Sequence, residues 1–189
     1  MRTDFLRRSV VLVGGALVLA GCSASAEPQA EPPAAPPSAS SPAFRFAVPA
    51  EFDGLPRTTT TKWTKVAQNA TRSLKRNMLR PLDTLTAVYV DTSDPAEGVE
   101  LSAVAGEVFD PADQLRLITG NLVGDWQDAE IEGGVGTCSV NREERPLIRT
   151  ECYWAEPRSV GRVSLWGLTD RRKDFPAIQR QVSRGTISG

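Results

Sequence analysis

Two neighbouring segments decide the fold: Thr84–Val90, TLTAVYV, and Val99–Val108, VELSAVAGEV. Both are dominated by β-branched and apolar residues, a composition typical of β-strands. The residues between them, 91–98 (DTSDPAEG), are rich in turn-forming types. The sequence therefore predicts two adjacent antiparallel strands.

The chain that follows predicts further strands and two helices. Asp110 before Pro111 is typical of a helix start, because aspartate caps free backbone amides and proline suits the first turn. Leu115, Ile118 and Leu122 then recur at helical spacing, so this helix is expected to end near Gly124. Residues 147–154 and 160–166 predict strands, and a last helix is expected from about Asp174.

The preceding residues add a strand and a basic helix. Phe44, Phe46 and Val48 alternate with Arg45 and Ala47, which predicts a half-buried strand ending at Pro49. Residues 62–80 separate an apolar stripe from a basic one, which predicts an amphipathic helix. This mixed order favours a single α+β domain, in which two or three helices pack on a mainly antiparallel sheet. The order is similar to the PsbP/Mog1-like sandwich, which implies that arrangement of layers.

The N-terminus indicates export and lipidation. Arg2, Arg7 and Arg8 precede an uncharged stretch, 9–21, which is too short to span a bilayer but suits a signal peptide. Leu19-Ala-Gly-Cys22 resembles the bacterial lipobox, which implies that Cys22 becomes the lipidated, palmitate-bearing first residue of the mature chain. The alternative is an ordinary signal peptide that ends at a chance cysteine. Sec and twin-arginine export both remain open.

The sequence therefore predicts three parts. Residues 1–21 form a lipoprotein signal peptide, residues 22–43 a lipidated cysteine and a Pro/Ala/Ser-rich stalk, and residues 44–189 a globular α+β domain. An extended stalk at roughly 3 Å per residue would reach about 60 Å from the lipid. We expect a monomer on the extracytoplasmic face of the cell membrane, held there by its lipid anchor.

Cysteine and histidine usage limits the chemistry. Cys138 and Cys152 are an even pair in an exported chain, which predicts a disulfide. Their spacing differs from that of C-x-x-C metal or redox motifs. The chain has no histidine, which excludes Ser-His-Asp and Cys-His catalysis and histidine-bound zinc. We therefore predict no metal, no cofactor and no enzymatic activity.

The segments around these cysteines carry a family resemblance. Gly133-Gly-Val-Gly-Thr-Cys138, followed by Cys152-Tyr-Trp-Ala-Glu156, a strand and a closing helix, resembles small exported or membrane-tethered actinobacterial proteins. The resemblance covers roughly residues 83–189. It implies no activity, ligand or catalytic residue, and the chain departs from the pattern at Glu156, where aspartate is more frequent.

Charge is strongly segregated along the chain. Residues 57–80 hold seven basic residues and no acid, whereas residues 83–132 hold twelve acids and only Arg116. One hypothesis is that the basic segment docks on anionic lipid or wall polymer. The alternative is that the two blocks pair with each other or are only solvated. Nucleic acid is not an expected partner. The candidate docking residues are Lys62, Lys65, Arg72, Lys75, Arg76 and Arg80.

Two other groups of residues have competing interpretations. The acids between Asp91 and Glu100 could suggest a calcium loop, but they lack EF-hand spacing, so we interpret them as an acidic turn. The four tryptophans could form a platform for sugars or muropeptides, although core positions are commoner and Trp154 is expected to pack on the disulfide.

Three functional hypotheses follow. The first is a ligand- or partner-binding module at the cell envelope, which a pocket lined by tryptophan and a few polar groups would favour. The second is an envelope interaction protein that docks through the basic segment 57–80. The third is a hydrolase that uses paired carboxylates, which two buried, facing carboxylates in a cleft would favour.

Overall fold

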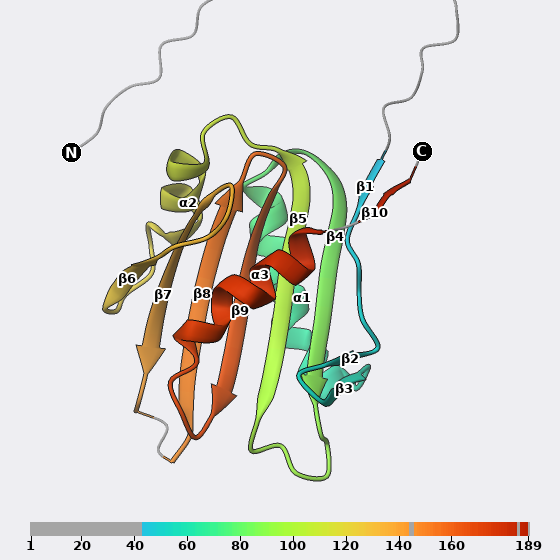
Figure 1. Cartoon of the computed structure of the whole chain (residues 1–189), viewed down its shortest axis with the longest axis vertical. Helices are drawn as coiled ribbons and strands as arrows, with labels where there is room; N and C mark the ends of the chain where they lie inside the picture. The colour runs from blue at the N-terminus through green and yellow to red at the C-terminus, as the bar shows by residue number, and fades with distance from the viewer. Residues whose placement is uncertain (1–42, 144–145, 185, 189) are drawn as a thin grey trace, which may run out of the picture. The chain divides into compact units, whose positions relative to one another are not determined.

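An antiparallel sheet of eight strands forms the centre of the domain (Figure 1). The computed structural model describes residues 43–143, 146–184 and 186–188, so the signal peptide, the lipobox and the stalk to residue 42 lie outside the described residues. The strand order is β2-β3-β4-β5-β9-β8-β7-β6. The strands are β2 (Glu51–Phe52), β3 (Leu55–Thr58), β4 (Leu79–Val90), β5 (Gly98–Glu107), β6 (Trp126–Ala129), β7 (Val135–Asn141), β8 (Ile148–Glu156) and β9 (Ser159–Gly167).

Helices cover both faces of this sheet. Helices α1 (Thr61–Arg76) and α2 (Pro111–Thr119) lie behind it in Figure 1, and α3 (Phe175–Ser183) crosses its front after a short 3-10 turn, Arg172–Asp174. Strands β1 (Ala43–Arg45) and β10 (Thr186–Ser188) pair with each other in a separate two-stranded sheet. The domain is therefore α+β with a mainly antiparallel sheet, as the sequence predicted.

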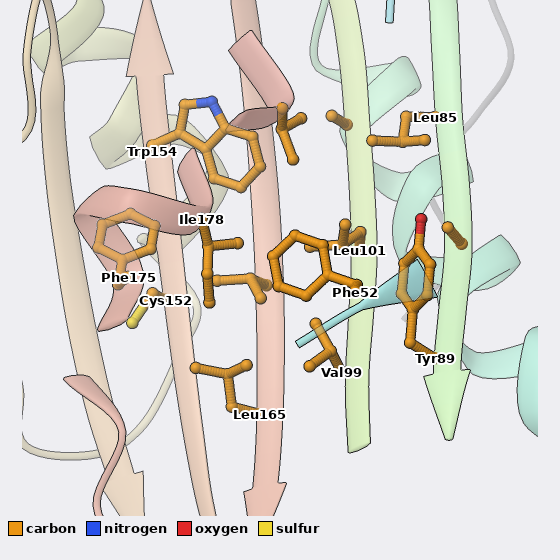
Figure 2. Packing of buried hydrophobic residues seen from close by; sticks show 14 of the residues in the cluster. Phe52, Leu85, Tyr89, Val99, Leu101, Cys152, Trp154, Leu165, Phe175 and Ile178 are labelled. Carbon is orange, nitrogen blue, oxygen red and sulfur yellow. The ribbon is translucent and has the colours of Figure 1, made fainter. Parts of the chain in front are cut away.

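The main core lies between the sheet and α3. Phe175 and Ile178 of α3 pack with Trp154, Leu101 and Leu165 from the central strands (Figure 2). Successive side chains of a strand point to opposite faces of the sheet. The residues next to these core residues in the sequence therefore point to the α1 side. The α1 side therefore carries the polar residues of the same strands.

The disulfide joins two neighbouring strands within this core. Cys138 of β7 and Cys152 of β8 are direct cross-strand partners, their Cα atoms 4.1 Å apart, and both are buried. The predicted pairing is confirmed. Trp154 shares the cluster, and its indole ring lies flat on Gly161 of β9, where an added Cβ would come within 2.1 Å of the ring.

The two strands that opened the sequence analysis are confirmed as a pair. Strands β4 and β5 run antiparallel, with Val88 opposite Glu100 and Val90 opposite Gly98. Strands β8 and β9 and the last helix are confirmed as well. The Asp110 cap also forms, its carboxylate accepting backbone N–H bonds from Ala112 and Asp113.

Four predicted boundaries were wrong, the first being the start of β4, which lies at Leu79 instead of Thr84. The basic helix ends at Arg76 instead of Arg80, because Leu79 already pairs with Glu107 in the sheet. The second helix ends at Thr119, ahead of the helix-weakening Gly120. The strand expected over 44–48 spans only Ala43–Arg45, because the Phe46 N–H donates to the Asp83 carboxylate instead of extending a ladder.

Candidate functional site: a tryptophan pocket and a basic helix

The α1 side of the sheet carries a strip of polar and charged residues. One row across the strands runs from Glu100 through Ser164 and Glu151 to Ser139, and the next runs from Ser102 through Arg162 and Tyr153 to Thr137. Helix α1 covers the β4, β5 and β9 part of this face, and α2 contacts β7 and β8. The strip therefore lies partly beneath α1 and partly beside it.

Arg162 organises this strip. Its guanidinium donates to Glu100 through Nη1 and to Glu151 through Nε, and the Tyr153 hydroxyl lies 3.2 Å from the same Glu151 oxygen. Burial alone would lower the pKa of Arg162, but the charges of Glu100 and Glu151 outweigh burial and raise it. Burial, followed by the charge of Glu151, raises the pKa of Tyr153. The network thus holds one cation between two carboxylates.

Two tryptophans stack at the end of this strip. Trp63 of α1 and Trp166 of β9 lie nearly parallel, with ring centroids 6.0 Å apart and an interplanar angle of 5°. Trp166 lies over Gly98, where an added Cβ would come within 1.9 Å of the ring, and its indole N–H donates to the Pro95 carbonyl at 3.2 Å. The ring is therefore fixed by the β5 backbone beneath it and by the β4–β5 turn.

A cavity of about 380 Å³ opens beside this pair. We call it the tryptophan pocket. Trp63 and Trp166 are half-buried, Val66 is 50% exposed, and the Lys62 ammonium lies 4.9 Å from the centroid of the Trp63 ring. A pocket of this size, mostly apolar with a few charged groups, is typical of small-molecule sites. Its lining residues are Lys62, Trp63, Val66, Pro95, Glu100, Leu147, Arg149 and Trp166.

The basic residues of α1 point to solvent. Lys62, Lys65, Arg72, Lys75 and Arg76 are all exposed, and none forms an ion pair within the part of the chain that the structure describes. The sole ion pair between the basic and acidic blocks, among the described residues, joins Arg80 to Glu107 at 3.9 Å. The charges of the two blocks therefore pair at this contact alone among the described residues, although α1 packs on β4 and β5 of the acidic block.

Glu156, at the end of β8, lies in a separate cluster. It accepts hydrogen bonds from Gln179 and Ser183 of α3 and from Ser159, the two serine distances being 3.0 Å. Burial raises the pKa of Glu156, and the two serine hydrogen bonds oppose this. Since the donors lie on α3 and β9, the carboxylate fastens α3 to the sheet.

The structure brings together residues that the sequence left apart. Trp63 and Trp166 were candidates for a platform, and they meet at the pocket, whereas Trp154 is core. Arg149 and Arg162 were not recognised as site residues. Arg162 could have been found, because an arginine between Val160 and Val163 in an otherwise apolar strand must have a partner when buried.

The acidic turn shows no sign of a metal site. Asp91 accepts hydrogen bonds from the Ser93 backbone and hydroxyl, at 2.9 and 2.6 Å. Within residues 43–143, 146–184 and 186–188, no group of three potential ligands gathers closely enough to hold a metal ion. In the same residues no helix is both long and apolar enough to cross a membrane.

Comparison with known proteins adds little to this geometry. No protein-family model matches the chain, and no curated protein matches its sequence. Among solved structures, it is similar to the extracellular domain of PknH from Mycobacterium tuberculosis, at 13% identity with a TM-score of 0.33. That alignment covers 51% of this chain and 60% of that one, so it spans less than two thirds of the PknH domain.

Proposed function

We propose that this protein is a lipid-anchored binding module on the extracytoplasmic face of the membrane, and that its ligand enters the tryptophan pocket. The observation that carries the proposal is the Trp63–Trp166 stack beside a cavity of about 380 Å³. Tryptophan faces bind flat rings and apolar groups, and the exposed Lys62 adds a positive charge at the edge of the pocket. The ligand class that fits is a small molecule with a flat or apolar face and ionised groups.

The sheet supports this function by fixing the pocket in advance. Trp166 cannot move toward β5, because the Gly98 backbone lies against it, and Glu100 is held by Arg162. A binding site that is already ordered loses less conformational entropy when the ligand arrives. The same rigidity argues against a role for Glu100 and Glu151 in hydrolysis, since both carboxylates bind one guanidinium and do not face each other across a cleft as acid and base.

The test is binding of an anionic aromatic dye, anilinonaphthalene sulfonate, to the full chain and to Val66→Glu. Val66 lines the pocket and is 50% exposed, so a glutamate there adds a negative charge at the site without disturbing the core. We expect the dye affinity to fall at least tenfold. The matched control is Leu117→Glu, which adds the same charge at a site on α2 that is 58% exposed.

The natural ligand is sought in parallel. The chain is purified from its host membrane, and bound small molecules are identified by mass spectrometry in the wild type and in Val66→Glu. A compound that accompanies the wild type and the Leu117→Glu control but not Val66→Glu supports the proposal. Equal dye affinity in all three proteins would overturn it.

A further inference from the structure

The exposed cations of α1 form one continuous surface. At 3.6 residues per turn, Lys62, Lys65, Arg72, Lys75 and Arg76 fall within an arc of about 140°. We call these five residues the basic stripe. They are exposed, and among the described residues none has an ion-pair partner. Helix α1 contains no acidic residue, so nothing on the helix offsets this charge.

The N-terminal part of the basic stripe is unfavourable for the helix, whereas the helix dipole favours Lys75 and Arg76 in the last turn. Lys62 and Lys65 lie in the first turns, where the helix dipole is positive and acids are favoured. The helix has no acid in its first turn, and the Thr60 side chain makes no capping hydrogen bond. Residues that are unfavourable for their local structure and do not stabilise the fold are expected at functional sites. A purely solvated helix face does not explain why cations were placed at this end.

Two exposed apolar side chains lie on β4, shortly after the end of α1 in the sequence. Leu79 and Leu82 follow α1 directly on β4 and are 64% and 68% exposed. The acids beside them are already paired, Glu107 with Arg80 and Asp83 with Arg45. Cations next to exposed leucines suit the interface of an anionic bilayer, where the charges meet head groups and the leucines enter the acyl boundary.

The N-terminal segment joins the domain beside β4, where Phe46 belongs to the core cluster under α3. Strand β1 contacts β4, and the Phe46 N–H donates to Asp83 of β4 at 3.0 Å. With the lipidation predicted at Cys22, the stalk would be at most about 60 Å long, so lipid head groups are the nearest dense anionic surface. The acidic residues Asp125 and Asp128 lie at the opposite edge, next to and on β6.

We infer that the basic stripe, with Leu79 and Leu82, docks the domain on the anionic surface of the membrane that anchors it. Docking places α1 against the bilayer and turns α3, on the other face of the sheet, away from it (Figure 1). The inference does not depend on the tryptophan pocket, because Lys65, Arg72, Lys75 and Arg76 are not among its lining residues.

The test measures which face of the anchored protein meets lipid. The full, lipidated chain is reconstituted in vesicles of phosphatidylglycerol and phosphatidylcholine, or of phosphatidylcholine alone, that contain a head-group quencher. A fluorophore is attached through Asn69→Cys, in the middle of the basic stripe, or through Gln181→Cys, on α3 across the sheet. Both positions are exposed. We expect quenching at position 69 only, in anionic vesicles only.

Charge variants test whether the cations of α1 cause the docking. Each cation near an anionic leaflet raises partitioning roughly fivefold, so Lys65, Arg72, Lys75 and Arg76 changed together to Gln should lower the docked fraction more than tenfold. Salt at 1 M, where the Debye length is about 3 Å, should do the same. The control removes equal charge elsewhere, with Arg158, Lys173, Arg180 and Arg184 changed to Gln, and should dock like the wild type.

Three results would overturn the inference. They are equal quenching at positions 69 and 181, quenching that the four Gln substitutions in α1 leave unchanged, and no quenching in anionic vesicles. If the last occurs while isolated wall polymer binds the wild type and not the α1 variant, the basic stripe serves a polymer instead of lipid.

Discussion

A single glycine determines the position of the pocket wall. Trp166 lies so close to Gly98 that an alanine there would place its Cβ 1.9 Å from the ring. We therefore expect Gly98→Ala to displace the ring, lower the free energy of unfolding by about 1–3 kcal/mol and change the tryptophan fluorescence. Urea unfolding and emission spectra measure both effects.

Gly167, the residue after Trp166, provides the control. An added Cβ there meets Glu97 Cγ at 3.5 Å, which is ordinary van der Waals contact. Gly167→Ala should leave the spectrum unchanged and alter stability little, because alanine only restricts the unfolded chain at a compatible position. If the two variants behave alike, Trp166 is not held by Gly98.

Replacing Arg162 by an uncharged residue leaves the buried Glu100 carboxylate without this ion-pair partner. The Glu100 side chain is only 6% exposed and pairs with Arg162, so Arg162→Met should cost about 3–5 kcal/mol of unfolding free energy. Adding Glu100→Gln to that variant removes the stranded charge and should recover a large part of the loss. Urea unfolding of the single and double variants decides this, and a single variant within 1 kcal/mol of wild type would contradict it.

At the scale of secondary-structure elements, the disulfide ties β7 to β8. Cys138→Ser and Cys152→Ser should each lower the unfolding free energy by about 3 kcal/mol, and by similar amounts, because either change removes the same bond. Thermal or urea unfolding under non-reducing conditions measures the loss. Labelling that finds both thiols reactive in the native, unreduced protein would contradict the pairing.

Glu156 joins α3 to the sheet, and its titration should affect stability. Because burial raises its folded pKa, the folded state binds this proton more tightly than the unfolded chain does. Its stabilising contribution is then complete below the unfolded value of about 4.3 and is lost as the pH rises through the folded pKa. Relative to Glu156→Gln, the wild type should therefore lose unfolding free energy as the pH rises from about 4 through the folded pKa of Glu156.

Urea unfolding at several pH values measures this difference. Glu132→Gln controls for the loss of one negative charge, because Glu132 is an exposed carboxylate that lines the same surface hollow as Glu156. If the unfolding free energy of the wild type, relative to that of Glu156→Gln, stays constant or rises with pH, burial is not the main influence on the pKa of Glu156.

The elements differ in how far the sequence could predict them. Strands β4, β5, β8 and β9 were predictable because they combine β-branched and apolar residues in continuous runs. Strand β7 was missed because it includes Gly136, which no strand propensity favours. Gly136 is needed because an added Cβ would lie 2.9 Å from the Phe175 ring. The tryptophan pocket was unpredictable in detail, since Trp63 and Trp166 meet only through the sheet order.

For the whole molecule, part of the segregation of charge along the chain is kept in space. The basic segment forms α1 and the start of β4, whereas many of the acids lie on and around α2 and β6 at the other edge of the sheet. Helix α1 packs on β4 and β5 of the acidic block, yet the two blocks exchange a single ion pair among the described residues. A protein with such a separation of charge takes a preferred orientation near a charged surface. A flexible tether alone would not set that orientation.

The anchor and the basic stripe should then differ in strength. Acyl chains contribute about 0.8 kcal/mol per buried methylene, far more than a few screened cations. We therefore expect Cys22→Ala to release the protein from the membrane fraction, whereas the four Gln substitutions in α1 should leave the anchored protein there and change only its orientation. Fractionation of cells that express each variant tests this. A Cys22→Ala chain that remains membrane-bound would contradict lipidation at Cys22, because docking by the stripe is too weak and too salt-sensitive to retain it alone.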